Sequence, residues 1–480
     1  MPIVLGVDLG TTKITCVAVD AHSGAMLASE SAVNDANITR DEDRAKGHSE
    51  WRADRILVAA NRSLFGAAKQ LGSRVNDVVG IGVTGQQHGV VLVDATTLQP
   101  VTPLINWQDR RALQMIPGGT STWLQATRDA IGPDAWKQTG CWLQPGFMAT
   151  TLFELRVRGE LPSNALALFI GDLFVATLTG QVPSTEPSSA GSSGVYDVRS
   201  RQWNNDAINA LGLSRSLFPE IREADEPVGG LTPEQSRSTG LLAGTPVFAP
   251  IGDHQASFLG SVADCRNSVL VNVGTGAQVA VFTDGFNFTS PIELRPFPCG
   301  GNLLSNVGLA GGWSYQVLEQ FFHSAGRSVF QVETDGKLYE TMNRLAETIP
   351  PGADGLRCDP QFSGTRLDST GRGSISGLSP QNFTAGHLAR AVLEGMSRSL
   401  HDGFKAIHQI TGCKPTTLVA AGNGLRENPL LARIVSEAFG LPMTFTRHRE
   451  EAAFGAALVA SVGADLFANV EEAAGSLLSQ

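Results

Sequence analysis

Two short segments of this chain, about half its length apart, follow the same plan of strand, Gly/Thr turn and strand. The first covers residues 3–20 around Gly10-Thr11-Thr12, and the second covers residues 269–283 around Gly274-Thr275-Gly276. Apolar and β-branched runs on either side of such a turn are typical of a β-hairpin. Because the unit recurs, the sequence predicts a duplicated architecture.

The length and the order of the expected elements are consistent with two α/β domains. A chain of 480 residues is too long for one ordinary core, since a domain takes about 100–200 residues. A helix over residues 52–71 precedes an apolar strand, and a helix over 429–439 follows another; this alternation is typical of α/β layers. The Gly-rich stretch 240–246 places the predicted division between domains 1–246 and 247–480.

One Ser-, Pro- and Gly-rich stretch, residues 183–194, has the composition of a flexible linker. It is followed at once by Tyr196-Asp197 and by a helix expected over residues 203–211, with no sign that a second core begins there. We therefore expect an ordered loop within the first domain.

Charge and cysteine usage exclude several classes of protein. The formal net charge of -10 has the wrong sign for binding nucleic acid or an anionic membrane surface through phosphate neutralisation. No run approaches the ~18–20 apolar residues of a membrane span, and the first residues lack the basic region of a signal peptide. The six cysteines are scattered, which favours reduced thiols and a cytoplasmic location over a disulfide framework or a zinc cluster.

Two turns have the chemistry of a nucleotide phosphate site. Asp8 ends a buried strand before Gly10-Thr11-Thr12-Lys13, where a carboxylate can hold Mg²⁺ while turn amides and hydroxyls receive phosphate oxygens. The alternative is a simple β-turn with an Asx-type hydrogen bond. Gly274-Thr275-Gly276 is a second turn of this kind, and two such loops facing each other across a cleft would enclose the phosphates.

Two further motifs follow strands. Gly422-Asn423-Gly424, with Asn428 nearby, lies between a strand and a helix, where glycine permits close contact with adenine or ribose; the alternative is a turn capped by Asn423. Asp253 follows the strand 247–251, at the end of a strand where α/β enzymes build their sites, and could accept a hydroxyl proton. The alternative for Asp253 is an N-cap of a helix over residues 255–260.

Two polar clusters are suited to a polyhydroxylated molecule. Gln87 and His88 follow one strand, and Trp107 and Asp109 follow the next apolar stretch. Hydroxyl groups need donors and acceptors, while the C–H face of a sugar packs on an aromatic ring. Taken singly, His88 would be a structural histidine and Trp107 a core residue. Their occurrence together favours sugar contact.

Taken in order, these motifs resemble the motif series of the FGGY carbohydrate kinases along the whole chain. The series is Asp8-Leu9-Gly10-Thr11-Thr12, Gly85-Gln86-Gln87-His88-Gly89, Asn106-Trp107-Gln108-Asp109, Gly252-Asp253-His254-Gln255, Gly274-Thr275-Gly276, Gly422-Asn423-Gly424 and Glu451-Ala452-Ala453-Phe454-Gly455-Ala456-Ala457. The resemblance implies an α/β fold of two ribonuclease-H-like domains of the actin type around a central cleft, with ATP held mainly by the second domain and sugar mainly by the first.

The resemblance also implies a role for each matching residue. Asp253 would be the catalytic base, and Asp8 and Asp253 would hold waters of the ATP-bound Mg²⁺. The implied sugar-contacting positions are Gln87, His88, Trp107, Asp109 and His254. The implied ATP-binding residues are Asp8, Thr11, Thr12, Lys13, Gly274, Thr275, Gly276, Gly422, Asn423, Gly424 and Asn428.

Within the family, residues 106–109, 419–428 and 359–366 are similar to sedoheptulokinases, so the expected substrate is sedoheptulose, phosphorylated at its terminal hydroxyl. A xylulokinase or other pentulose kinase is the alternative, although Gln87 stands where xylulokinases usually have Met. A protein of another class, an actin-like sugar sensor that closes on ATP without phosphorylating anything, is the second alternative. The expected partners are ATP and a ketose, with a homodimer compatible with this reading and no nucleic acid or membrane.

Overall fold

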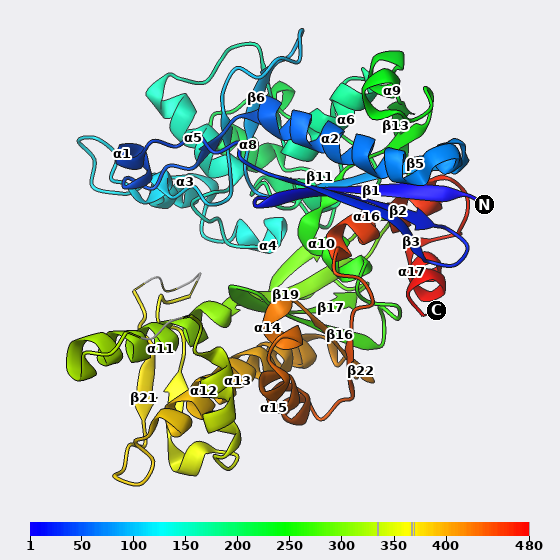
Figure 1. Cartoon of the computed structure of the whole chain (residues 1–480). Helices are drawn as coiled ribbons and strands as arrows, with labels where there is room; N and C mark the ends of the chain where they lie inside the picture. The colour runs from blue at the N-terminus through cyan, green and yellow to red at the C-terminus, as the bar shows by residue number, and fades with distance from the viewer. Residues whose placement is uncertain (334–335, 366–367, 369, 480) are drawn as a thin grey trace.

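The computed structural model of the chain describes residues 1–333, 336–365, 368 and 370–479, which form two lobes, one above the other in Figure 1. Each lobe is built on one large sheet. Both Gly/Thr-linked segments form antiparallel hairpins, as predicted, and each hairpin lies inside one of these sheets.

The first sheet has the strand order β13-β14-β5-β1-β2-β3, and β15 also pairs with β5. The hairpin β1–β2 is antiparallel, while β1 runs parallel to β5. The strands are β1 (Ile3–Leu9), β2 (Lys13–Asp20), β3 (Met26–Val33), β5 (Val78–Gly85), β13 (Pro227–Gly230), β14 (Pro246–Phe248) and β15 (Ile251–Gly252).

The second sheet repeats this arrangement in the order β18-β19-β17-β16-β22-β23. Again an antiparallel hairpin, β16–β17, is followed by a parallel neighbour, β22. The predicted duplication is therefore confirmed at the level of strand order. The strands are β16 (Ser268–Val273), β17 (Gly276–Thr283), β18 (Glu293–Pro296), β19 (Asn302–Ala310), β22 (Thr417–Ala421) and β23 (Met443–Phe445).

Helices cover both sheets, and two of them lie where the lobes meet (Figure 1). α10 (Asp253–Leu259) packs against α16 (Glu451–Gly463), and α16 packs on β1 and β5. A Cβ on Gly6 would lie 1.8 Å from the carbonyl oxygen of Ala453, and one on Gly82 would lie 1.9 Å from that of Ala456. Glycine in the strands therefore lets the small-residue helix approach the sheet closely.

Two of the helices expected from the sequence are found with nearly the expected bounds, and a third is shorter than expected. α2 (Ala53–Leu71) packs on β2 and β3, and α15 (Pro429–Phe439) packs on α13 (Ala385–Thr411). The helix expected over residues 203–211 is limited to α8 (Asn205–Ala210), because Trp203 pairs with Tyr196 between β10 (Tyr196–Asp197) and β11 (Gln202–Trp203) and Asn204 caps the helix.

The remaining elements are short or peripheral. They include α1 (Asp41–Arg44), α3 (Trp123–Ile131), α4 (Trp136–Thr139), α5 (Met148–Arg158), α6 (Ile170–Thr179), α7 (Pro187–Ala190), α9 (Pro233–Thr239), α11 (Gly312–Ala325), α12 (Tyr339–Glu347), α14 (Asn423–Arg426), α17 (Val470–Leu478), β4 (Glu50–Trp51), β6 (Val91–Asp94), β7 (Leu104–Ile105), β8 (Ala165–Leu168), β9 (Ser184–Thr185), β12 (Glu220–Ile221), β20 (Arg357–Asp359) and β21 (Ser374–Ser376). Among the described helices, none is long and apolar enough to cross a membrane.

The change from one sheet to the other does not coincide with the division expected between residues 246 and 247. β14 and β15 follow that point, and both pair in parallel with β5 of the first sheet. The second sheet begins at β16. The backbone pairing to β5 thus keeps the segment that carries Asp253 attached to the first lobe.

Candidate active site

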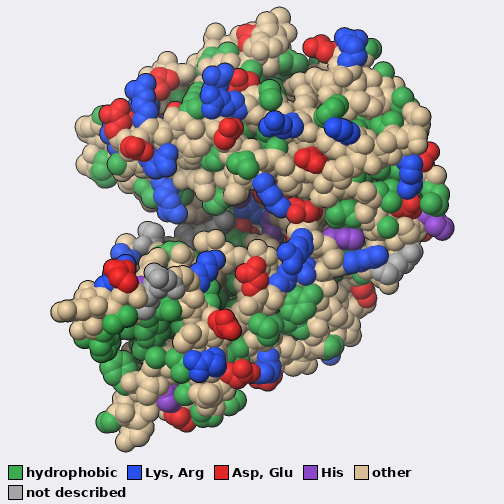
Figure 2. Space-filling model, viewed as in Figure 1, with side chains coloured by type: hydrophobic (Ala, Val, Ile, Leu, Met, Phe, Trp, Pro, Cys, Tyr) green, Lys and Arg blue, Asp and Glu red, His purple; other side chains and the backbone are tan. Residues whose placement is uncertain are grey.

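A cavity of about 360 Å³ lies between the lobes, where the space-filling view is hollowed (Figure 2). Six residues predicted from the sequence line it together, and residues of the second lobe complete its wall. The predicted residues are Asp8, Gln87, His88, Trp107, Asp253 and His254, and the others are Gly10, Ser257, Gln278, Glu293, Arg295, Val307 and Ala452.

Three neighbouring strand ends explain why the predicted residues meet. β1, β5 and β15 are parallel, and Gly85 at the end of β5 pairs with both Leu9 of β1 and Gly252 of β15. The carboxyl ends of parallel strands form one edge, so Gln87, Asp253 and the Asp8 segment reach the same place. The sequence placed each motif at a strand end, and the strand pairing brings them together.

Asp8 and Asp253 are two half-buried carboxyl groups that line this cavity. Burial, together with the charges of Asp253 and Glu450, raises the pKa of Asp8 to about 8, against the opposing effect of Lys13. Burial also raises the pKa of Asp253 to about 6, although its carboxylate is stabilised by the backbone N–H groups of His254 and of Asp253 itself. Each group is thereby shifted toward the pH range where a proton acceptor works well.

The helix that begins at Asp253 has Gly252 in its N-cap position, and Asp253 is the first helical residue. The alternative that Asp253 serves as the N-cap is therefore wrong. Asn423 is likewise not a cap, because Gly422 precedes α14 with a φ of 83° and Asn423 is its first residue.

The sugar-side residues have firm supports. Gln87 donates its amide Nε2–H to the carbonyl oxygen of Ser188 at 2.7 Å. His88 stacks on Phe147 with ring centroids 4.2 Å apart, and His254 Nε2 lies 2.8 Å from the hydroxyl of Ser305. These contacts leave the cavity faces of the three side chains in defined positions.

Trp107 is 47% exposed, so the alternative that it is a core residue is wrong. Its indole Nε1–H donates to the hydroxyl of Thr11 at 3.0 Å, which joins the sugar side of the cavity to the first predicted phosphate loop. An exposed, hydrogen-bonded indole is suited to packing against a sugar face.

Asp109 does not line the cavity. Its carboxylate is buried, accepts the backbone N–H of Ser49 at 2.7 Å and forms an ion pair with Arg111 at 2.8 Å. Arg111 also reaches Glu50, at 2.6 Å. The oxygens of Asp109 are thus hydrogen-bonded within the lobe, and a sugar contact by this residue stays a prediction.

Two charged residues of the second lobe, Glu293 and Arg295 on β18, also line the cavity and were not predicted from the sequence. Arg295 is buried, pairs with Glu293 at 2.9 Å and donates to the carbonyl oxygen of Gly191 at 3.0 Å. Its guanidinium lies 5.7 Å from the ring centroid of Phe147. The alternation Glu-x-Arg in an otherwise apolar strand could have indicated these residues, because charged side chains are seldom buried unless they are paired or functional.

A second, larger cavity of about 650 Å³ lies in the lower lobe between α11, α12, α13 and α14. Gly274, Thr275, Asn423, Gly424 and Asn428 line it, as expected for the nucleotide side. The side chain of Asn428 accepts the N–H of Leu431 at 3.0 Å and so caps α15, and its amide also contacts Asn343.

Gly276 and Gly422 support this cavity without lining it. Gly274 N–H donates to the carbonyl oxygen of Gly276 at 2.9 Å, which closes the turn. A Cβ on Gly422 would lie 2.5 Å from the carbonyl oxygen of Val273, so only glycine fits where β22 ends.

The first phosphate loop is held from two sides. Asn34 donates its backbone N–H to the carbonyl oxygen of Thr12 at 3.0 Å and its amide to that of Gly10 at 2.9 Å. Lys13 pairs with Glu450 at 2.7 Å, which ties the loop to the start of α16. Asn34 had no motif around it in the sequence and is found only from these contacts.

The two carboxyl groups fit a magnesium ion that keeps most of its waters. Among the described residues, no group of three His, Cys, Asp or Glu side chains could hold a metal by itself. Mg²⁺ bound to phosphates needs only one or two carboxylates, because it retains several waters. Asp8 Oδ1 is buried and lacks a hydrogen-bond partner in the described structure, and the charge of Asp253 raises the pKa of Asp8. A cation bound here would therefore offset both the desolvation of this oxygen and the repulsion between the two carboxylates.

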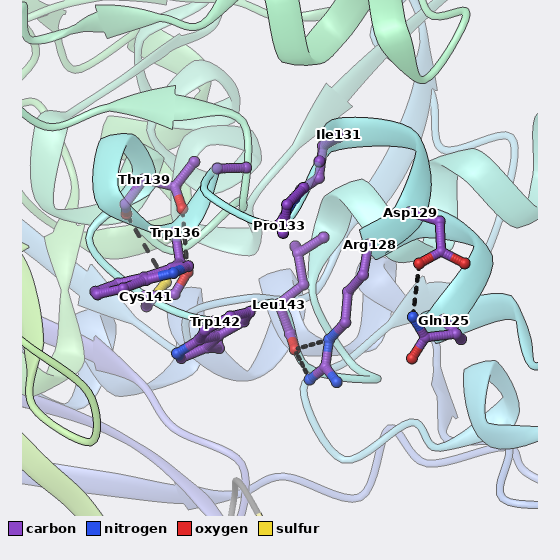
Figure 3. Close-up of a pocket in the computed structure, with 12 residues that line it drawn as sticks. Gln125, Arg128, Asp129, Ile131, Pro133, Trp136, Thr139, Cys141, Trp142 and Leu143 are labelled. Atoms are coloured by element: carbon purple, nitrogen blue, oxygen red, sulfur yellow. Dashed lines mark hydrogen bonds between the residues drawn. The ribbon is translucent and has the colours of Figure 1, made fainter.

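A third hollow, of about 420 Å³, lies in the upper lobe between α3 and α4, away from all of the predicted residues (Figure 3). Trp136 and Trp142 stack there with ring centroids 5.3 Å apart. The guanidinium of Arg128 donates to the carbonyl oxygen of Leu143, and Gln125 donates to Asp129 (Figure 3). Arg128 and Gln125 are thus hydrogen-bonded within this lobe, and none of the residues predicted to bind ATP or sugar lines this hollow.

Comparison with known proteins identifies both halves of the chain. The model of the FGGY family of carbohydrate kinases, N-terminal domain, matches residues 3–260, and that of the C-terminal domain of the same family matches residues 295–464. Glycerol kinase 2 of Streptomyces avermitilis is 28% identical over 98% of this chain and 90% of that protein. Sedoheptulokinase of Homo sapiens is 29% identical over 95% of this chain and 97% of that protein.

Solved structures agree on the fold. The crystal structure of xylulose kinase from Rhodospirillum rubrum superposes with a TM-score of 0.86 at 23% sequence identity, covering 98% of this chain and 92% of that one. The expected two-domain fold of the actin type is therefore confirmed, while the relatives differ in the sugar or polyol that their names state.

Proposed function

We propose that this chain, which belongs to the FGGY family of carbohydrate kinases, transfers the γ-phosphoryl group of ATP to the terminal hydroxyl of a ketose. Sedoheptulose is the proposed substrate, and xylulose or another pentulose is the alternative. In this proposal the residues 1–246 supply the sugar site and the first phosphate loop, and the residues 247–480 supply the base, the second phosphate loop and the adenosine site.

The observation that carries the proposal is the place of Asp253. Its half-buried carboxyl group lies in a cavity with Gln87, His88 and Trp107, at the meeting point of the two lobes. A hydroxyl group bound there can donate its hydrogen bond to Asp253, which accepts the proton as the oxygen attacks the γ-phosphorus. This is direct transfer, so no covalent phosphoenzyme is required, and positioning supplies most of the rate.

The nucleotide would occupy the lower cavity with its phosphates directed toward the two Gly/Thr loops. The resemblance places Thr11, Thr12 and Lys13 on one side of the phosphates and Gly274 to Gly276 on the other. Mg²⁺, held through water by Asp8 and Asp253, would supply positive charge that neutralises the phosphates. Lys13 keeps its partner Glu450 in the structure, so its part is to fix the loop as well as to add charge.

Three features support a substrate longer than glycerol. The cavity of about 360 Å³ is larger than a three-carbon polyol requires. Glu293 and Arg295 add polar groups at the wall opposite the first lobe, where the far hydroxyls of a longer chain would lie. The matched sedoheptulokinase also aligns over 97% of its length.

A coupled assay of ADP formation with sedoheptulose, xylulose, ribulose, fructose and glycerol tests the proposal. We expect the highest kcat/KM with sedoheptulose and the phosphate on its terminal hydroxyl. A clear preference for xylulose or glycerol would replace the substrate while keeping the reaction. Tight ATP binding with no transfer to any of the five would favour the sugar sensor instead.

The proposed location is the cytoplasm, where ATP is supplied, and a homodimer is compatible with the proposed function. Size-exclusion chromatography with light scattering measures the assembly directly, and a monomeric mass would remove the dimer from the proposal.

A further inference from the structure

The Ser-, Pro- and Gly-rich stretch that resembles a linker in composition is buried along its whole length, from residue 183 to residue 194. Ser188 and Ser192 have no exposed surface, and neither has Glu186. Burying so many backbone and hydroxyl groups is costly unless each of them is paired. The pairing partners of this stretch are therefore informative.

One partner is a sugar-side residue. The backbone N–H of His88 donates to the hydroxyl of Ser192 at 3.1 Å, and the Nδ1 of the same histidine lies 3.0 Å from the carbonyl oxygen of Ser192. His88 has a φ of 73°, a left-handed conformation that a side-chain-bearing residue rarely adopts without support. Ser192 thus holds both the backbone and the ring of His88.

Ser188 has two partners at the cavity. Its carbonyl oxygen accepts the amide of Gln87 at 2.7 Å, and its hydroxyl oxygen accepts the backbone N–H of Gly252 at 2.8 Å. Gly252 is the residue before Asp253 and the N-cap of the helix that Asp253 begins. One residue of the buried stretch therefore contacts both the sugar side and the segment that carries the base.

The orientation of the Ser188 hydroxyl is determined by Glu186. The Oε2 atom of Glu186 accepts the backbone N–H of Ser188 at 2.7 Å and also the hydroxyl hydrogen of Ser188, as the carbonyl oxygen of a neutral carboxyl group can. A hydroxyl has a single proton, so donating it to Glu186 leaves lone pairs free to accept the N–H of Gly252. The chain of hydrogen bonds runs in one direction, from Gly252 to Ser188 to Glu186.

We propose that Ser188 is a positioning residue that aligns Asp253 through Gly252, while Ser192 separately aligns His88. The inference rests on the proposed function, because it assigns Asp253 as the base. The space around Gly252 is tight: a Cβ there would lie 2.1 Å from the amide nitrogen of Gln87. A shift of this turn therefore moves the base relative to the bound hydroxyl, and a misplacement near 1 Å can cost about 10²-fold in rate.

The experiment compares Ser188→Ala with Ser192→Ala in steady-state kinetics with sedoheptulose and the other four substrates. Ser188→Ala removes the acceptor of Gly252 N–H and leaves the backbone carbonyl that holds Gln87. We expect kcat to fall by about 10- to 100-fold with the ketose KM changed less than about threefold. Ser192→Ala should raise the ketose KM more than it lowers kcat.

The matched control is Ser461→Ala in α16. Ser461 is also fully buried and donates its hydroxyl to a backbone carbonyl, that of Leu458 at 2.6 Å, but it does not line the cavity. We expect a similar change in melting temperature for Ser461→Ala and Ser188→Ala, with kcat reduced only in the latter.

Failure of the positioning role and failure of the proposed function give different results. If the wild-type protein turns over a ketose and Ser188→Ala keeps kcat within about twofold of Ser461→Ala, the positioning role is refuted and the proposed function stands. If the wild-type protein transfers phosphate to none of the substrates, the proposed function is refuted and the inference falls with it. A KM effect in Ser188→Ala with unchanged kcat also refutes it.

Discussion

Replacing Asp253 by asparagine distinguishes the role of its carboxylate as a proton acceptor from its role in the local structure of the site. Asparagine keeps the shape of the side chain and one acceptor oxygen, so the hydrogen bonds from the backbone N–H groups at the start of α10 are retained in part. It loses the charge and the ability to accept a proton. We therefore expect nearly complete loss of transfer with little change in melting temperature or in ATP affinity.

The magnitude follows from the role assigned to the carboxyl group. General-base assistance is worth about 10²–10⁴-fold, which corresponds to roughly 2.7–5.5 kcal/mol of transition-state stabilisation. Because the charge of Asp253 raises the pKa of Asp8, which is about 8 in the wild-type cavity, removal of the Asp253 charge should lower that pKa. That change favours the ionised form of Asp8 and preserves the site for the nucleotide.

The pH dependence gives a second, independent measurement. Burial raises the pKa of Asp253 to about 6, and a base must be ionised to work. The rate should therefore fall as pH decreases through about 6, with roughly a tenfold loss of kcat/KM at one unit below that value. The Asp253→Asn variant should lack this acidic limb in its residual activity.

The assay is ADP formation coupled to a ketose, with Asp94→Asn as the matched control. Asp94 accepts backbone and hydroxyl groups of Thr97 in an exposed turn away from the cavity, so its variant removes one carboxylate without touching the site. The reasoning is refuted if Asp253→Asn retains kcat within about tenfold of wild type, below the low end of the range for a general base.

Three other results are expected. Trp107→Ala should raise the ketose KM about tenfold or more, because the aromatic ring provides the sugar contact. Trp107→Phe should raise it less, since phenylalanine keeps a ring and loses only the hydrogen bond to Thr11 that orients the indole. Equal KM values for both variants and wild type would contradict this role. Burial raises the pKa of Glu186 to about 8, so the stability that its neutral form contributes is fully present below the ordinary pKa of a glutamate and is lost as pH rises through about 8. Glutamine cannot ionise, so the Tm of Glu186→Gln should fall less than that of wild type between pH about 5 and 9. Parallel plots of Tm against pH for the two proteins would refute the assignment. Sugar and ATP together should reduce the radius of gyration in small-angle scattering, because each lobe supplies one phosphate loop, and an unchanged curve would count against closure.

Local signals in the sequence were sufficient for much of the fold. The two hairpins, the strand that precedes Asp253 and the helix Ala53–Leu71 are determined by residue periodicity and by Gly/Thr turns within short windows. The position of each motif at a strand end followed from the same patterns. The repeated hairpin also indicated the duplication, because a recurring local unit is visible without knowledge of contacts.

The tertiary structure decided which of these residues meet and what supports them. Asp109 was predicted from its sequence neighbours to contact sugar, but its carboxylate pairs with the Arg111 guanidinium and the Ser49 N–H, a charge-assisted arrangement that only the folded chain shows. Arg295 and Glu293 reach the site from the second sheet, nearly two hundred positions from Trp107, and no local pattern specifies that approach.

The buried stretch around Ser188 shows most clearly the difference between what local sequence predicts and what tertiary contacts decide. Its Ser-, Pro- and Gly-rich composition predicts only that the backbone can turn, and the sequence context indicated that it is ordered. Its role depends on hydrogen bonds to Gln87, His88 and Gly252, each about sixty to a hundred residues away along the chain. Short-range propensities determine elements, whereas the burial of polar groups is satisfied by partners that only the folded chain brings within hydrogen-bonding distance.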